Sequence, residues 1–375
     1  DEEAITYAHH QGQQDPRSYA MLLERVGRTT GDALFACHWL TEAANVWATT
    51  LGDAHRAARA LMTAIDRDPT QAAPAEKLAD LYREKGDNKA LVALLERRTK
   101  ALAPLTAQDP NMAAYVAAMH EELARLWAEP PLAQAKKAIE NYRRAIELQP
   151  GSQYSIYALR ELYKSQEQWL EAIPLFAMEQ ALTDDPERQV ALYSDEAEVR
   201  KQAGDGAGSS MSLRHAGSVD QGRDPALRQA LASSVLDRAQ AGENVGDDER
   251  YEAAGLFNQL AEEYGGEYGV SYAVCALEIE PGDDRAIQLA MFYGGQEGRD
   301  EELRPRAAKY LMVNPNGAMA GECQGYIGDA DVRSLAAQVP APGSQAAESE
   351  PRMAQTAAAS TGKSSRRLEV ADEVS

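Results

Sequence analysis

Apolar residues between positions 138 and 150 recur with the 3.6-residue period of an α-helix. The residues on this apolar face are Ala138, Ile139, Tyr142, Ala145 and Ile146. Pro150 ends the run, because proline lacks the backbone donor that a continuing helix needs. A helix of about 13 residues is marginal in water unless tertiary packing covers its apolar face. The pattern therefore predicts that other helices pack against this one.

The same pattern returns after 34 residues. The matching residues in the next copy are Ala172, Ile173 and Phe176. Further copies occupy four other stretches, at residues 57–69, 78–95, 273–281 and 307–315. The prolines that end the last two copies are also 34 residues apart. A second amphipathic segment precedes each copy, so the repeating unit is predicted to be a pair of helices.

This unit resembles the tetratricopeptide repeat family, whose helix pairs carry small residues where helices touch and a proline between units. The resemblance covers residues 38–316 and implies an all-α fold, a right-handed α-solenoid of stacked antiparallel helix pairs. It implies about seven pairs, in which each apolar face packs against its partner helix and the next repeat. The high Ala content and the use of Arg over Lys are typical of a high-GC bacterium.

The chain is expected to contain five regions. They are an N-terminal segment with a capping helix (1–37), tetratricopeptide-like repeats (38–202), an irregular repeat or hinge (203–246), further repeats (247–316) and a disordered tail (317–375). The third region is rich in Gly and Ser and has a poor apolar stripe, which leaves open an irregular repeat or a bend between two arrays. The tail has few large apolar residues, so we expect that the part after Glu322 can be removed without unfolding the array.

The charge of the chain narrows the choice of partners. Its 59 acidic and 38 basic residues give a formal net charge of −21, which argues against nucleic-acid binding and favours basic partners. No apolar run is long enough to span a bilayer. The chain begins with Asp1, so a cytoplasmic location and an envelope location after removal of a signal peptide both stay open.

Catalytic, cofactor and metal sites are not expected. The glycines at 204, 206 and 208 lack the Gly-Lys-Ser/Thr ending of a phosphate-binding loop. Cys37 and His38 are adjacent on a predicted helix and point to different faces, and the three cysteines have no paired spacing. No trio of Ser, His and acid can be singled out. We therefore predict that the chain is not an enzyme and has no cofactor.

In the family that the pattern resembles, the first helix of each unit lines a concave groove that binds peptides or helices. The groove positions implied here are Trp39, Glu42, Glu76, Asp80, Arg83, Glu121, Arg125, Tyr154, Tyr157, Glu161 and Lys164. Glu76 and Asp80 stand where family members that grip a C-terminal carboxylate have Lys and Asn, so binding of that kind is not expected. Tyr154, Tyr157 and Trp39 are either aromatic anchors for a partner or packing residues between repeats.

These features predict a protein-interaction scaffold or adaptor whose partner is a basic or helical segment. Two alternative functions are compatible with the same fold, so the fold does not discriminate among the three. One is a regulatory or recruiting module of a larger enzyme or signalling protein. The other is an envelope-associated assembly factor of a bacterial secretion or motility machine.

Overall fold

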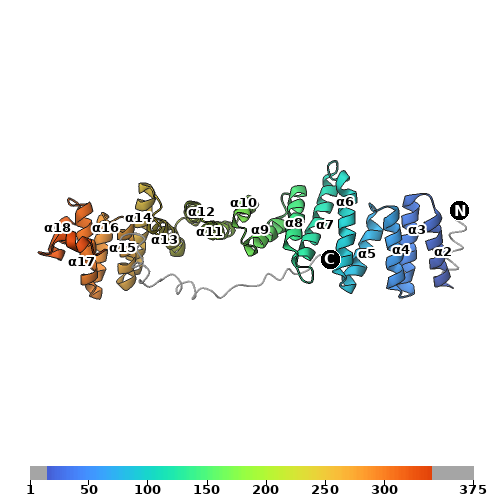
Figure 1. Ribbon diagram of the computed structural model, residues 1–375, viewed down its shortest axis with the longest axis horizontal. Coiled ribbons are helices and arrows are strands. Elements are labelled where there is room, and N and C mark those ends of the chain that lie inside the picture. Colours follow the sequence, from blue (N-terminus) through green and yellow to red (C-terminus); the bar gives the residue numbers. More distant parts are fainter. Residues whose placement is uncertain (1–14, 340–375) are drawn as a thin grey trace. The chain divides into compact units, whose positions relative to one another are not determined.

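The computed structural model describes residues 15–339. Every regular element in that range is a helix. The chain divides into two compact units, Asp1–Asp184 and Asp185–Ser375. Within each unit, successive helices run in opposite directions and lie side by side (Figure 1). The all-α solenoid of stacked helix pairs predicted from the sequence is therefore confirmed.

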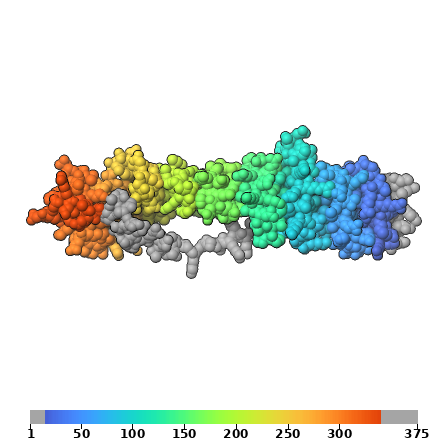
Figure 2. Space-filling view, viewed as in Figure 1, coloured from blue at the N-terminus to red at the C-terminus, as the bar shows by residue number. Residues whose placement is uncertain are grey.

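The first unit contains the helices α2 to α10. Their bounds are α2 (Pro16–Thr29), α3 (Ala33–Asn45), α4 (Ala54–Arg67), α5 (Ala72–Lys85), α6 (Asn88–Leu102), α7 (Pro110–Ala128), α8 (Ala135–Leu148), α9 (Gln153–Ser165) and α10 (Trp169–Gln180). A π-helical turn, Val46–Thr50, continues α3, and a short 3-10 turn, Ala103–Leu105, follows α6. Around this second turn the α6–α7 connection stands out from the surface of the unit (Figure 2).

Aspartate residues precede several of these helices. The side chains of Asp53, Asp87 and Asp109 each accept a hydrogen bond from a backbone N–H in the first turn of α4, α6 and α7. Such an N-cap stabilises a helix by about 1 kcal/mol. The helix boundaries therefore follow from local sequence as well as from packing.

The apolar face of residues 138–150 lies on α8 and is covered as the pattern requires. Ala138, Tyr142 and Ala145 are buried, and α8 packs against both α7 and α9. The small side chains let the helix axes approach, while the Tyr142 ring fills the space between neighbouring helices. The apolar pattern of this segment thus describes one layer of a core that several helices share.

The second unit contains α11 to α19. Their bounds are α11 (Pro186–Gln202), α12 (Gly206–Asp220), α13 (Pro225–Gln240), α14 (Asp247–Tyr264), α15 (Gly266–Ile279), α16 (Asp284–Glu297), α17 (Asp300–Val313), α18 (Ala320–Ile327) and α19 (Val332–Ala336). Before the pair α14–α15, whose second helix carries the repeat motif, the unit has the three helices α11, α12 and α13. This odd number explains why the repeat pattern loses its phase between residues 203 and 246.

Alternate helices of the second unit form two layers. In one layer the Lys201 ammonium of α11 lies 2.9 Å from the Asp237 carboxylate of α13, and the Gln240 amide of α13 donates to Glu278 of α15. In the other, Arg214 of α12 pairs with Glu252 of α14. Residues 203–246 thus contain the regular helices α12 and α13, and polar contacts join them to α14 and to α11 and α15.

The weak apolar stripe of α12 has a physical explanation. Ser209, Ser210 and Ser212 are buried where other helices carry larger apolar residues. The hydroxyl of Ser210 lies 2.6 Å from that of Ser234 on α13, so this polar group has a partner inside the core. A pattern that counts only apolar residues misses such an interface.

The expectation of a disordered tail from residue 317 is wrong for residues 317–339. α18 and α19 are helical, and Cys323 and Ile327 of α18 are buried in the same cluster as Tyr310 of α17. These two apolar side chains are enough to pack α18 against the core, because α17 already presents an apolar face. The rest of the predicted tail, residues 340–375, lies outside the described residues.

Candidate partner-binding surface

The eleven predicted groove residues all lie on alternate helices of the first unit, namely α3, α5, α7 and α9. Polar contacts join α5 to α7 and α7 to α9, so these three helices form one layer. The surface made by α5, α7 and α9 is called the α5–α9 face below. Trp39 and Glu42 lie nearer the start of the unit, on α3.

Arg83 joins α5 to α7. Its Nε and Nη2 atoms donate to the two carboxylate oxygens of Glu122, both at 2.9 Å, and its Nη1 donates to Asp80 at 2.7 Å. The hydrogen bond to Glu122 is the main reason that the pKa of Arg83 is raised. The hydroxyl of Tyr115 donates to Glu76 on α5. Two predicted groove residues, Glu76 and Arg83, therefore make contacts between neighbouring repeats, and Asp80 pairs with Arg83 on their own helix.

Glu121 joins α7 to α9 in the same way. Its carboxylate accepts hydrogen bonds from the hydroxyl of Ser155 at 2.6 Å and from that of Ser152 at 3.1 Å. Arg125, one turn further along α7, is exposed. The partners Glu122, Tyr115 and Ser155 were not predicted from the sequence, because the repeat pattern marks the helices but not their polar contacts.

Tyr154 and Tyr157 stand almost one turn apart on α9 with 49% and 45% of their surface exposed. Burial and the neighbouring Tyr154 both raise the pKa of Tyr142, which places Tyr154 against α8. The ring of Tyr157 lies 5.5 Å from the guanidinium carbon of Arg160. Each tyrosine thus contacts a neighbouring side chain and is also half-exposed, so packing within the unit accounts for only part of its surface.

The remaining predicted residues are held by neighbours on their own helices. On α9, Glu161 pairs with Lys164 at 3.2 Å. On α3, the half-buried Trp39 ring packs edge-on against His38 with ring centres 4.9 Å apart, and Glu42 accepts from the Asn45 amide. Trp39 packs against His38 of its own helix and not against either tyrosine of α9, so the three predicted aromatic anchors do not form one cluster.

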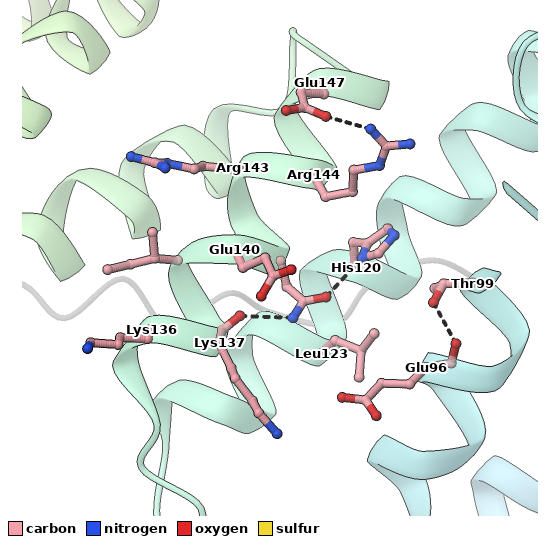
Figure 3. Close-up of a pocket in the computed structure, with 12 residues that line it drawn as sticks. Glu96, Thr99, His120, Leu123, Lys136, Lys137, Glu140, Arg143, Arg144 and Glu147 are labelled. Atoms are coloured by element: carbon pink, nitrogen blue, oxygen red, sulfur yellow. Dashed lines mark hydrogen bonds and ion pairs between the residues drawn. The ribbon is translucent and has the colours of Figure 1, made fainter.

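A separate cleft of about 630 Å³ lies between α6 and α8, and residues of α7 also line it (Figure 3). Its charged lining consists of Lys136, Lys137, Arg143, Arg144, Glu96, Glu140 and Glu147. Several of these charges are already engaged: Arg144 pairs with Glu147, and the Lys137 ammonium lies 3.8 Å from the centre of the Trp127 ring. Cations and carboxylates nearly balance, so the cleft selects neither an anion nor a cation.

His120 forms part of the floor of this cleft. Its Nδ1 lies 2.9 Å from the Asn141 side-chain oxygen (Figure 3). Burial lowers the pKa of His120, although the hydrogen bond to Asn141 acts in the opposite direction. Charging this imidazole therefore opposes folding.

The His120 pKa predicts a pH effect on stability. The unfolded chain takes up the proton first as the pH falls below 6.5, so the free energy of unfolding falls until the pH reaches the folded pKa. We expect the free energy of unfolding of His120→Gln to depend less on pH between about pH 7.5 and pH 5, because glutamine stays neutral and still donates to Asn141. Denaturant titrations across this range measure the difference. Parallel curves for the two proteins would show that His120 does not contribute.

Residues 15–339 offer neither a metal-binding cluster nor a membrane span. No group of three or more His, Cys, Asp or Glu side chains in this range is placed to hold a metal ion. Nor does this part of the chain contain a helix that is long and apolar enough to cross a membrane.

Comparisons with known proteins find similarity only to solved structures. No family model and no curated protein matches the chain. Among solved structures, it is similar to MamA, with 16% identity and a TM-score of 0.32 over 51% of this chain and 94% of that one. It is also similar to YrrB, described as a tetratricopeptide repeat protein with an unusual peptide-binding site, with 15% identity and a TM-score of 0.28 over 56% and 92%. A third is Pseudomonas aeruginosa pilF, with 14% identity and a TM-score of 0.28 over 67% and 95%.

These identities and TM-scores are too low to transfer a partner or an activity to this chain. The fold assignment rests on the helix pairs and the 34-residue period themselves. The chain is an all-α solenoid of tetratricopeptide-like helix pairs.

Proposed function

We propose that the chain is a non-catalytic interaction scaffold and that the first unit binds a partner across the α5–α9 face. The observation that carries this proposal is the pair Tyr154 and Tyr157, each of which contacts a neighbouring side chain and is also half-exposed. Tyrosine offers a large contact area at little cost in side-chain entropy, and it is common at the energetic centres of interfaces.

The support beneath Tyr157 favours this role. Arg160 is buried next to it and pairs with Glu179 of α10 at 2.8 Å. The guanidinium carbon of Arg160 also lies 4.4 Å from the centre of the Phe176 ring. A ring held in place before binding loses less freedom when a partner arrives.

The charge of the α5–α9 face favours a basic partner segment. Carboxylates outnumber cations among its named residues: Glu76, Asp80, Glu121, Glu122 and Glu161 against Arg83, Arg125 and Lys164. The net charge of −21 acts in the same direction by steering basic partners toward the chain. We infer a basic peptide or helix that places an apolar residue between the two tyrosine rings.

Affinity capture from the source organism tests this proposal. The intact chain is compared with the double variant Tyr154→Ala, Tyr157→Ala and with a control, Tyr251→Ala, which removes another exposed ring, from α14. Circular dichroism first checks that all three are folded. We expect one protein to be captured by the intact chain and by the control but not by the double variant. Equal capture by all three would overturn the role of the α5–α9 face.

A further inference from the structure

Three tyrosines meet at the corner between α14 and α15, in the sequence YGGEYGVSY of residues 264–272. Only Gly265 separates the two helices. Gly265 and Gly266 have φ angles of +59° and +53°, a region in which a side chain is strained, so this tight corner needs glycine. The rings of Tyr264, Tyr268 and Tyr272 form what we call the tyrosine row.

The rings of the tyrosine row lie against one another. The ring centre of Tyr264 is 6.5 Å from that of Tyr268 and 5.8 Å from that of Tyr272. Tyr264 and Tyr268 are 51% and 52% exposed. Three adjoining tyrosines with two of them half-exposed present an aromatic surface that the fold of the second unit does not itself cover.

Contacts below the row hold it in place. Tyr272 stacks on the buried ring of Phe257, and its hydroxyl donates to Gln229 of α13 at 3.1 Å. Nearby, a side-chain carbon at Gly269 would lie 2.8 Å from the Tyr293 ring, so α15 packs closely on α16. The row is therefore a preformed surface on packed helices.

Carboxylates surround the same corner. Glu263 is paired with Arg228 at 2.6 Å, and Glu262 accepts from Arg285 at 2.7 Å. Glu267 and Glu297 are exposed, and no cation among the described residues forms an ion pair with either of them. Glu297 reaches the turn, since its Oε1 atom would lie 3.6 Å from a side-chain carbon at Gly266. The tyrosine row and the carboxylates around it thus form a negatively charged aromatic surface.

We propose that the tyrosine row binds a basic segment of a partner protein. An Arg or Lys side chain of this segment lies on the ring face of Tyr264 or Tyr268 and pairs with Glu267. The face of a tyrosine ring attracts a cation, and Glu267 beside the rings adds an ion pair to this contact. A purely apolar partner would leave Glu267 and Glu297 desolvated without a counter-charge, which is unfavourable. This surface lies in the second unit and does not depend on the α5–α9 face.

A defined probe tests the proposal in the full chain. The probe is a fluorescent peptide with blocked ends that carries three arginines on an alanine and glycine background, and the reference peptide has glutamine in their place. Anisotropy is measured with the intact chain and with the double variant Tyr264→Ala, Tyr268→Ala, both checked by circular dichroism. We expect the double variant to bind the arginine peptide at least about tenfold more weakly, since stacked aromatic anchors dominate such contacts.

Three further variants separate the contributions of the ring faces, the carboxylate and the first unit. Tyr264→Phe, Tyr268→Phe should retain binding, because the ring faces remain. Glu267→Gln should weaken binding and reduce its salt dependence. Tyr154→Ala, Tyr157→Ala should leave it unchanged, which distinguishes this surface from the α5–α9 face. The proposal is overturned if the intact chain does not bind the arginine peptide, if the reference peptide binds equally, or if the alanine variant binds within about twofold of the intact chain.

Discussion

Ending the chain after Glu322 is expected to lower the stability of the second unit by about 3 kcal/mol, because this cut removes the buried side chains Cys323 and Ile327. Tyr310 and Leu303 of α17, which are fully buried in the same cluster, then lose part of their cover. In a solenoid each element is stabilised mainly by its neighbours, so the loss falls on α16 and α17 first. Thermal denaturation and amide hydrogen exchange of these two helices measure it.

A chain that ends after Val339 is the matched control for this truncation. It retains α18 and α19 with all their described contacts and should show the same exchange protection in α16 and α17 as the intact chain. The substitution Ile327→Ala should reproduce about half or more of the loss, since it empties one of the two buried sites. If the chain ending at Glu322 melts like the intact chain, α18 does not complete the core, and the segment after Glu322 is dispensable, as its composition alone predicts.

Glu179→Ala is expected to destabilise the first unit by about 3–5 kcal/mol, because it removes the buried carboxylate that pairs with Arg160 and leaves this buried cation only the more exposed Glu161, at 3.3 Å. Arg160 and Glu179 are only 3% and 6% exposed, and their charged groups meet at 2.8 Å. Water cannot replace the carboxylate without opening the contact between α9 and α10. Denaturant unfolding followed by circular dichroism measures the change.

Two comparisons isolate the buried charge as the cause. The double variant Arg160→Met, Glu179→Leu removes both charges, keeps apolar volume and should be near the intact chain in stability. Glu147→Ala removes one member of an exposed pair with Arg144 and should change stability by less than about 1 kcal/mol. A loss below about 1 kcal/mol for Glu179→Ala would contradict this account and would mean that Glu161 or water compensates the charge of Arg160 when Glu179 is gone.

The helix pairs were predictable from the sequence because the signal is local and repeated. Ala138 and Tyr142 lie on the same apolar face in the sequence and in the structure, and Pro150 follows the last helical residue by two positions. Each repeat gives the same information again, so errors in one copy are corrected by the others. This is why the class of fold was recovered.

Other features depend on which helices lie side by side, and the pattern does not state this. Buried serines such as Ser210 read as loop residues until their partners on α13 are known. The core role of Cys323 and Ile327 depends on the open face of α17, which their own segment does not reveal. The tyrosine row likewise arises from a two-helix corner that brings Tyr264 next to Tyr268 and Tyr272.

The predicted groove residues include features that the sequence pattern predicts and features that depend on neighbouring helices. The family pattern placed all eleven on alternate helices, because the helix phase fixes the layer to which each helix belongs. It could not separate Arg83 and Glu121, which join neighbouring helices, from Tyr154 and Tyr157, which remain half-exposed. Side-chain partners set that difference, and they become visible only when the repeats are stacked.

Hydrogen exchange of the scaffold with and without its captured partner tests the role of the α5–α9 face most directly. We expect slower exchange on binding in residues 121–125 of α7 and 154–164 of α9, with no change in α6 and α8, which line the separate cleft. Protection confined to α6 and α8, or a complex that leaves α7 and α9 unchanged, would contradict the assignment of the α5–α9 face as the partner-binding surface.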